Sequence, residues 1–346
     1  MKVFGRVKKL WKGLPLQTKK KLSLVGISLF VLNILVLTAG ILLSGSHPVF
    51  VGLLALAYGL GLRHAVDADH IAAIDNTTRK FIQDGRKLYT IGFSFSLGHA
   101  TIVIFLSLLT SFASNFIKHA LPFFSSIGFF IGTTVSSLFL VLIGIINLIA
   151  FFEILHAFKQ AVRKKKMLHS HKVPSMMGPL TKLFRPLMNT VNLSWHMYFI
   201  GFLFGLGFDT ASEIALLSIS AVNAMSGFSL AIVLLLPLAF TAGMTVVDTF
   251  DGILMVGAYG WAFINPARKL YYNLTITFLS VVIAFFIGGI QVIHVFSTQF
   301  NVHNSFFAFF DSIDLGNMGY IIVSAFLLFW IISICFYKMK KYDILF

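Results

Sequence analysis

The 346-residue sequence has little charge for its length. Charged residues make up 11% of the chain and hydrophobic residues 58%, whereas a soluble domain carries about 25% charged residues. A soluble core cannot hide so much apolar surface, so the composition argues against a soluble enzyme, a nucleic-acid-binding module and a disordered chain. It fits a protein with several transmembrane segments.

Cysteine is nearly absent, and two catalytic motifs are missing. The single cysteine, Cys335, allows no intrachain disulfide and no thiolate metal cluster. The sequence contains no G-x-x-x-x-G-K-[ST] phosphate loop, which argues against ATP hydrolysis through that motif. It contains no H-E-x-x-H either, which argues against a zinc protease of that type.

Long apolar runs dominate what is present. A helix needs about 20 apolar residues to cross the hydrocarbon core of a bilayer. We therefore predict an all-α membrane protein with about eight transmembrane helices, the sixth of which is a candidate broken helix. The predicted spans are 22–44, 50–75, 88–112, 126–152, 196–222, 228–260, 271–297 and 318–337.

Lysine and arginine fall on alternate connections between these spans. Only Lys118 and Arg63 lie elsewhere, so 25 of the 27 basic residues fall on one face, which the positive-inside rule assigns to the cytoplasm together with both termini. The net charge of +15 therefore indicates orientation and attraction to anionic lipid rather than nucleic-acid binding. The predicted organisation is a basic cytoplasmic tail (1–21), a first transmembrane half (22–158), a basic cytoplasmic loop (159–195), a second transmembrane half (196–337) and a cytoplasmic tail (338–346).

The two transmembrane halves contain a weak internal echo. The sequence Gly-Leu-Gly occurs at 59–61 and again at 205–207, and polar residues follow it both times. Similarly, Gly98–His99 in the third span corresponds to Gly243–Met244 in the sixth. The second and fifth spans are three crossings apart and run in opposite directions. This predicts an inverted repeat, an arrangement in which transporters bind substrate near the midplane.

Half of the twelve acidic residues fall inside predicted spans. A lone carboxylate at mid-bilayer costs on the order of 3 kcal/mol, and Arg63 is the only basic residue at that depth. A bound cation or protons must therefore compensate, which makes these residues functional candidates. They are Asp67, Asp69, Asp209, Glu213, Asp248 and Asp251.

Histidines accompany these carboxylates. In the second span His64, Asp67 and His70 are spaced three apart, so neighbours share one side of a helix. Imidazole and carboxylate together suit Ni²⁺, Co²⁺, Zn²⁺ or Mn²⁺. The candidate metal ligands are His64, Asp67, Asp69, His70 and His99, and the candidate supporting residues are Arg63, Asp209, Glu213, Asp248 and Asp251.

Several of these residues have structural alternatives. His99 alone could be a hydrogen-bonded interhelical histidine, and Asp209 with Glu213 could form a proton site or a structural polar pair. Asp248 and Asp251 could cap a broken helix. Asp69 lies well round the helix from His64 and could pair with Arg63 instead of a metal.

Four blocks of sequence resemble the nickel/cobalt transporter family of bacterial and fungal permeases. They are RHAVDADHI (63–71), FSLGHATIV (95–103), LGFDTASEI (206–214) and GMTVVDTFDG (243–252). The resemblance implies an eight-helix permease of the bacterial cytoplasmic membrane that takes up Ni²⁺ or Co²⁺ with high affinity. It places His64, Asp69 and His70 in the family signature, with Asp67 inside it. The other blocks contain His99, Asp209, Glu213, Asp248 and Asp251. Two positions differ from the family pattern. Ala100 occupies a position where the family commonly has a hydroxyl residue, and Ser212 occupies one where it commonly has Thr.

The resulting hypothesis is a secondary, non-enzymatic permease whose metal is substrate rather than cofactor. Its expected partners are the divalent metal and membrane lipid, with no nucleic acid and no obligatory ATPase subunit. Three alternatives remain at this stage: an efflux permease of related architecture, a membrane enzyme with a histidine–carboxylate metal centre, and a membrane subunit of an ATP-driven importer.

Overall fold

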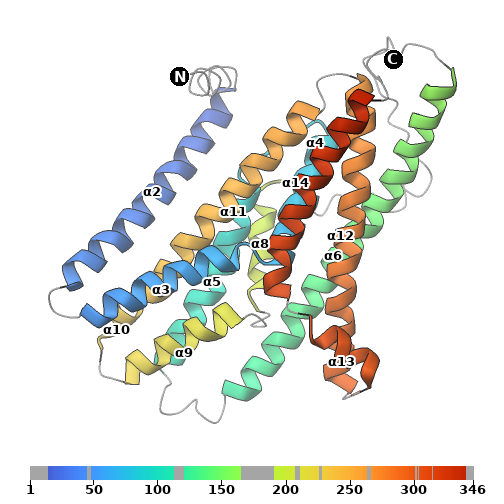
Figure 1. The fold of residues 1–346 in the computed structure, drawn as a ribbon. Coiled ribbons are helices and arrows are strands. Elements are labelled where there is room, and N and C mark those ends of the chain that lie inside the picture. The colour runs from blue at the N-terminus through green and yellow to red at the C-terminus, as the bar shows by residue number, and fades with distance from the viewer. Residues whose placement is uncertain are drawn as a thin grey trace.

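A computed structural model of the chain describes residues 15–44, 48–112, 121–164, 191–206, 211–225, 228–262, 266–300, 302, 304–313 and 315–339. Within these ranges the regular structure is entirely helical, which confirms the all-α prediction. The helices are α2 (Leu16–Ser44), α3 (Pro48–His64), α4 (Ala68–Gln83), α5 (Ile91–Phe112), α6 (Leu121–Lys164), α8 (His196–Phe204), α9 (Ala211–Met225), α10 (Leu230–Val233), α11 (Leu235–Ala262), α12 (Pro266–Phe300), α13 (Ser305–Asp311) and α14 (Leu315–Met339) (Figure 1).

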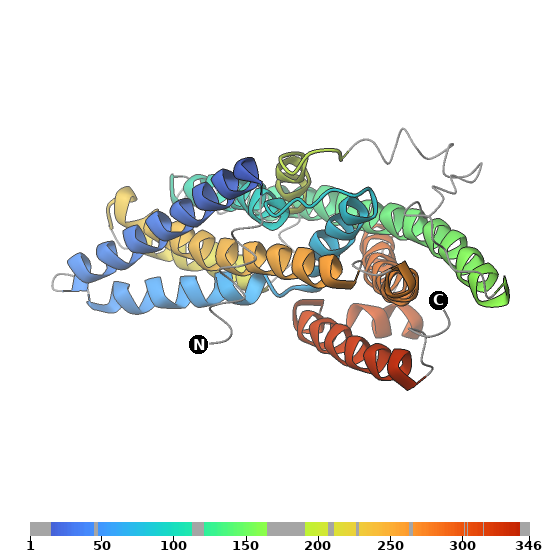
Figure 2. The same cartoon turned by 90° about the horizontal axis from the view of Figure 1, so that it is seen from above.

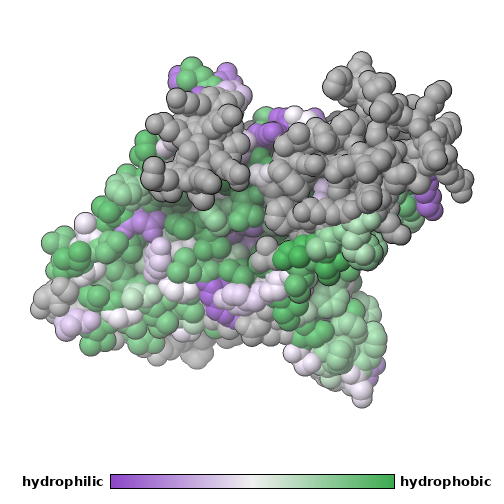
Figure 3. All heavy atoms as spheres, turned by 45° about the horizontal axis from the view of Figure 1, so that its top comes forward, coloured by the Kyte–Doolittle hydropathy of each residue, from purple (hydrophilic) through white to green (hydrophobic). Residues whose placement is uncertain are grey.

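Five stretches among the described helices are long and apolar enough to cross a membrane: Leu16–Leu43, Ile91–Ser111, Gly132–His156, Leu230–Gly257 and Tyr271–Phe300. A sixth is formed if the bent pair α3 and α4 counts as one span. The apolar parts of α9 and α14 are shorter. Large apolar side chains remain exposed along most of these helices, and Figure 3 shows broad hydrophobic surfaces on the sides of the molecule. Such surfaces suit contact with lipid.

The helices form one elongated bundle. The start of α2 and the end of α14 lie at the same end of the bundle (Figure 1). Seen from above, α2 and α3 lie on one side and α14 and the later part of α6 on the other, with α4 between them (Figure 2). The candidate histidines come from three of these helices, α3, α4 and α5.

The predicted second span is not one continuous helix. It bends by 51° between α3 and α4, at the connection of residues 65–67. The sixth span is also interrupted, but only at Leu234, between α10 and α11. Pro237 accounts for this break, because a proline ring clashes with the carbonyl four residues earlier, here that of Val233. Asp248 and Asp251 lie inside α11 and do not cap this break.

Two glycines let α3 and α11 cross at backbone contact. A Cβ atom on Gly61 of α3 would overlap the carbonyl of Phe240 on α11. A Cβ atom on Gly243 of α11 would overlap the carbonyl of Tyr58 on α3. Such contact between small residues is the usual way in which membrane helices approach closely.

The crossing of α5 and α8 repeats this pattern. A Cβ atom on Gly201 of α8 would overlap the carbonyl of Phe95 on α5, and one on Gly98 of α5 would overlap the carbonyl of Tyr198 on α8. On each of the four helices, the contacted carbonyl belongs to the residue three positions before the glycine of the same helix. On α11, for example, Phe240 precedes Gly243 by three positions. α5 descends and α11 rises in Figure 1, so the shared pattern supports an inverted internal repeat.

The contacts change the register that the sequence echo suggests. Gly98 matches Gly243, as expected, but Gly61 matches Gly201 and not the Gly205–Gly207 segment. In this register both α3 and α8 end three residues after the shared glycine, at His64 and Phe204. The three-letter Gly-Leu-Gly similarity was too short to fix an alignment.

Candidate metal centre

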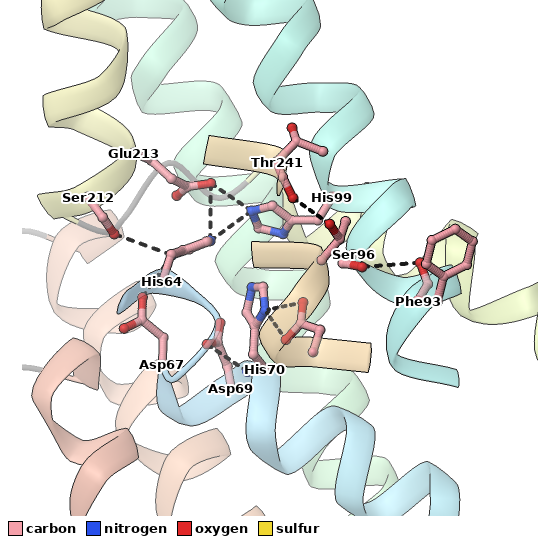
Figure 4. Close-up of polar contacts among 12 residues, drawn as sticks. His64, Asp67, Asp69, His70, Phe93, Ser96, His99, Ser212, Glu213 and Thr241 are labelled. Carbon is pink, nitrogen blue, oxygen red and sulfur yellow. Dashed lines mark hydrogen bonds and ion pairs between the residues drawn. The ribbon is translucent and has the colours of Figure 1, made fainter. Parts of the chain in front are cut away.

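Three histidines from three helices meet in the interior. His64 is the last residue of α3, His70 lies in the first turn of α4, and His99 lies in the middle of α5. They are 2%, 1% and 3% exposed. One ring nitrogen from each lies within 4.8 Å of the others (Figure 4). Residues from both sides of the break in the second span are thus brought to the third span.

A carboxylate joins two of these imidazoles in a tight triangle. Nε2 of His64 and Nε2 of His99 are 2.9 Å apart. Oε1 of Glu213, in the first turn of α9, is 2.8 Å from Nε2 of His99 and 3.7 Å from Nε2 of His64. Figure 4 shows the three side chains pointing toward one another. The second half of the chain therefore supplies an acidic group to the histidines of the first.

Two further carboxylates hold the far side of the rings. Oδ2 of Asp67 is 2.9 Å from Nδ1 of His64. Both oxygens of Asp248, on α11, approach Nδ1 of His70 at 3.3 and 3.4 Å. A carboxylate on one ring nitrogen fixes the tautomer and directs the other nitrogen toward a metal. Nε2 of His70 is buried and has no hydrogen-bond partner among the described residues, so it is available to a ligand.

The break between α3 and α4 creates this arrangement. After His64 the chain makes a turn, with the amide of Val66 donating to the carbonyl of Arg63 and that of Asp67 to the carbonyl of His64. Asp67 then adopts an extended conformation (φ −63°, ψ 148°) at the N-cap of α4. A continuous helix would place the His64 and Asp67 side chains one turn apart on its surface, whereas the turn folds them together beside the start of α4.

Helix α14 packs against the break between α3 and α4. A Cβ atom on Gly319 of α14 would overlap the carbonyl of Val66. Only a residue without a side chain lets α14 lie this close to the connection. The C-terminal helix therefore helps to fix the position of Asp67 and, through it, of His64.

Aromatic rings form the apolar wall of the site. The ring of Phe240 lies 5.4 Å from that of His64, and the ring of Phe95 lies 4.9 Å from that of His70 in an edge-to-face contact. Both phenylalanines are fully buried. Electrostatic attraction is stronger in such water-poor surroundings than in bulk solvent, so a cation placed among these groups would be held more strongly than in water.

The remaining predicted residues lie around this centre rather than in it. Oδ1 of Asp69 accepts a hydrogen bond from the backbone amide of His70, and the described structure shows no ion pair between Asp69 and Arg63. Asp251 lies one turn beyond Asp248 on α11, and its Oδ2 is buried without a hydrogen-bond partner in the described part of the chain. Asp209 lies outside the described residues.

Two contacts went unnoticed in the sequence. Oγ of Ser212 lies 3.4 Å from Nδ1 of His64, and Phe240 packs on the same ring. Serine and phenylalanine are common throughout this chain, so the residue types alone did not predict contacts with His64. Their proximity to His64 depends on the tertiary fold.

Comparisons with known proteins identify the family. A family profile described as "High-affinity nickel-transport protein" matches residues 50–336. The high-affinity nickel transport protein of Cupriavidus necator is 44% identical over 302 residues, covering 86% of each chain. The nickel transporter NixA of Staphylococcus aureus is 42% identical (86% of this chain and 88% of the relative), and the cobalt transport protein NhlF of Rhodococcus rhodochrous is 38% identical (82% of each). No solved structure matches. The chain therefore belongs to the high-affinity nickel-transport protein family.

Proposed function

We propose that the chain takes up Ni²⁺ and/or Co²⁺ across the bacterial cytoplasmic membrane as a secondary permease. Its family makes it a transporter rather than an enzyme. Most relatives are named for nickel and one for cobalt, so both ions are included. The observation that carries the proposal is the buried triangle of His64, His99 and Glu213.

The spacing of this triangle suits a transition-metal ion. With metal–ligand bonds of about 2.0–2.1 Å, neighbouring ligand atoms lie about 2.9 Å apart in octahedral and about 3.3 Å apart in tetrahedral geometry. The three distances of 2.8, 2.9 and 3.7 Å bracket these values. A dication between His64, His99 and Glu213 needs little rearrangement of the chain, and Nε2 of His70 can supply a further ligand.

The charges also balance. Neutral imidazoles bind a metal without adding charge, and a buried dication needs anionic neighbours. Glu213 supplies one negative charge in direct contact, while Asp67 and Asp248 supply others behind the histidines. Carboxylates in the first turns of α4 and α9 also offset the positive ends of these helices, which would otherwise repel a cation.

Alternating access follows from the repeat. We infer eight crossings, with α3–α4 and α8–α9 as two broken spans and with both termini in the cytoplasm. The site lies where the α3–α11 crossing meets the α5–α8 crossing, so movement of one pair against the other would open it to either side. The membrane potential can drive uptake, because about 2.3 kcal/mol per charge at 100 mV gives a dication about 4.6 kcal/mol, or roughly 2,000-fold accumulation.

Uptake of radiolabelled nickel and cobalt by cells expressing the chain tests the proposal. His64→Ala and His99→Ala should each abolish uptake while reaching the membrane in normal amounts. His156→Ala is the matched control, because His156 is an exposed histidine of α6. Normal transport by either site variant would overturn the site, and export of preloaded metal by the parent would overturn the direction.

A further inference from the structure

A polar cavity lies away from the metal centre, at the end of the bundle where α2 begins. Its volume is about 180 Å³, several times the roughly 30 Å³ that one water molecule occupies in the liquid. Two lysines line it, Lys21 from α2 and Lys87 from the connection between α4 and α5. The other polar residues of the lining are Gln17, Thr18, Tyr89, Thr90 and Ser194. None of the described residues that line it is acidic.

The two lysines are not engaged elsewhere in the described part of the chain. Neighbouring Arg86 donates to the carbonyl of Asn192 at 2.6 Å, and Lys80 donates to that of Val191 at 3.2 Å. Lys21 and Lys87 make no comparable contact among the described residues. Two exposed lysines and several hydroxyl-bearing residues that line one cavity can donate hydrogen bonds to an anionic oxygen ligand, above all a phosphate.

The cavity lies at the boundary between water and lipid. The apolar stretch of α2 starts at Leu16 and that of α5 at Ile91, so the cavity lies level with the ends of both spans. Leu22 and Leu88 line its apolar side. A lipid with its headgroup among the lysines would therefore have its acyl chains beside the bundle, where lysine stems commonly reach toward the membrane surface.

We propose that this cavity binds the phosphate of an anionic phospholipid of the cytoplasmic leaflet and thereby ties α2 to the rest of the bundle. The leaflet follows from the orientation under the proposed function. α2 needs such a tie, because only Val25 and Val36 of its large side chains are buried in the described structure. Free inorganic phosphate shares the chemistry of the headgroup, but it would not use the apolar side of the cavity.

Lipid binding to the purified full chain tests this assignment without any metal. Native mass spectrometry and thermal melting would compare phosphatidylglycerol, phosphatidylcholine and inorganic phosphate. The test variant is Lys21→Gln/Lys87→Gln. The matched control is Lys20→Gln/Lys159→Gln, which removes the same charge from exposed lysines outside the cavity. A third variant, Lys21→Arg/Lys87→Arg, keeps the charge.

Phosphatidylglycerol should bind the parent and raise its melting temperature more than phosphatidylcholine does. Its affinity should fall about 30-fold in the test variant, because each lysine near an anionic surface contributes about 1 kcal/mol and 1.4 kcal/mol is tenfold. The control and the arginine variant should stay near the parent. Equal loss in the control, or no loss in the test variant, would overturn the site. Inorganic phosphate binding that reproduces the whole effect would overturn the lipid assignment. Failure of nickel uptake would leave these results unaffected.

Discussion

The α3–α11 and α5–α8 crossings have the same packing but different chemistry. Both rely on a reciprocal pair of glycines against backbone carbonyls. At the end of α3 the chain carries His64, whereas the matching end of α8 carries Phe204. Directly after the glycine, α5 carries His99 where α11 carries Met244. The shared packing therefore forms the framework, and the three histidines of the proposed metal site all lie in the first half of the chain.

Exchanging the differing residues should have the largest effect. His64→Phe makes the first crossing resemble the second and removes a central ligand of the proposed site. We expect a loss of nickel uptake of at least about 100-fold, at the upper end of the range for changes near a metal site. Uptake measured beside the amount of protein in the membrane checks this. Phe204→Leu, at the matching position, should retain uptake, and equal losses in both variants would contradict the comparison.

Neutralising the support of a histidine should have the next largest effect. Asp248→Asn leaves the side chain in place but removes the charge that holds Nδ1 of His70. Loss of such a partner typically costs 10- to 100-fold in metal affinity. We expect a rise of roughly 10-fold in the KM for nickel, with a smaller change in maximal rate. A fall in maximal rate alone would instead assign Asp248 to a conformational step.

The glycine crossings should respond alike despite their different chemistry. Gly61→Ala and Gly201→Ala each place a methyl group against a backbone carbonyl that cannot move aside easily. Overpacking of this kind costs about 1–3 kcal/mol, so both variants should lower the thermal stability of the purified chain by similar amounts. Gly59→Ala, with open space around its Cβ position, is the control. A loss confined to one crossing would refute their equivalence.

The smallest effect is expected at Ser212. Its hydroxyl lies 3.4 Å from Nδ1 of His64, which already has a closer partner in Asp67 at 2.9 Å. Ser212→Ala should raise the KM for nickel by no more than about fivefold, because a net hydrogen bond is worth about 1 kcal/mol or less. A larger change in concentration-dependent uptake would show that the hydroxyl, rather than Asp67, orients His64.

The residue types of the proposed site were predictable from sequence, because charged and imidazole side chains are rarely found in an apolar run without a functional role. His64, His70 and His99 were therefore all candidates. Which carboxylate contacts which histidine was not predictable, because that depends on the fold. Glu213 touches the histidines directly while Asp67 and Asp248 stand behind them, and sequence spacing alone could not rank these carboxylates.

Of the two helix breaks, one could be located from the sequence and the other could not. The break before α11 could have been placed, because Pro237 marks it through the clash with the carbonyl of Val233. The break after His64 has no proline or glycine within residues 62–68, and the apolar pattern continues through Ala65 and Val66. Tertiary contacts accompany this break, including the contact of Gly319 with Val66. Such contacts between distant segments cannot be recognised from the sequence around His64.

X-ray absorption of the purified chain loaded with Ni²⁺ identifies the atoms that bind the metal. We expect at least two imidazole ligands with nitrogen at about 2.0–2.1 Å, together with a carboxylate oxygen. In the double variant His64→Ala/His99→Ala this imidazole signal should be lost, while His156→Ala should keep it. A nickel spectrum with oxygen ligands only, or one that the double variant leaves unchanged, would show that the metal does not bind between His64 and His99.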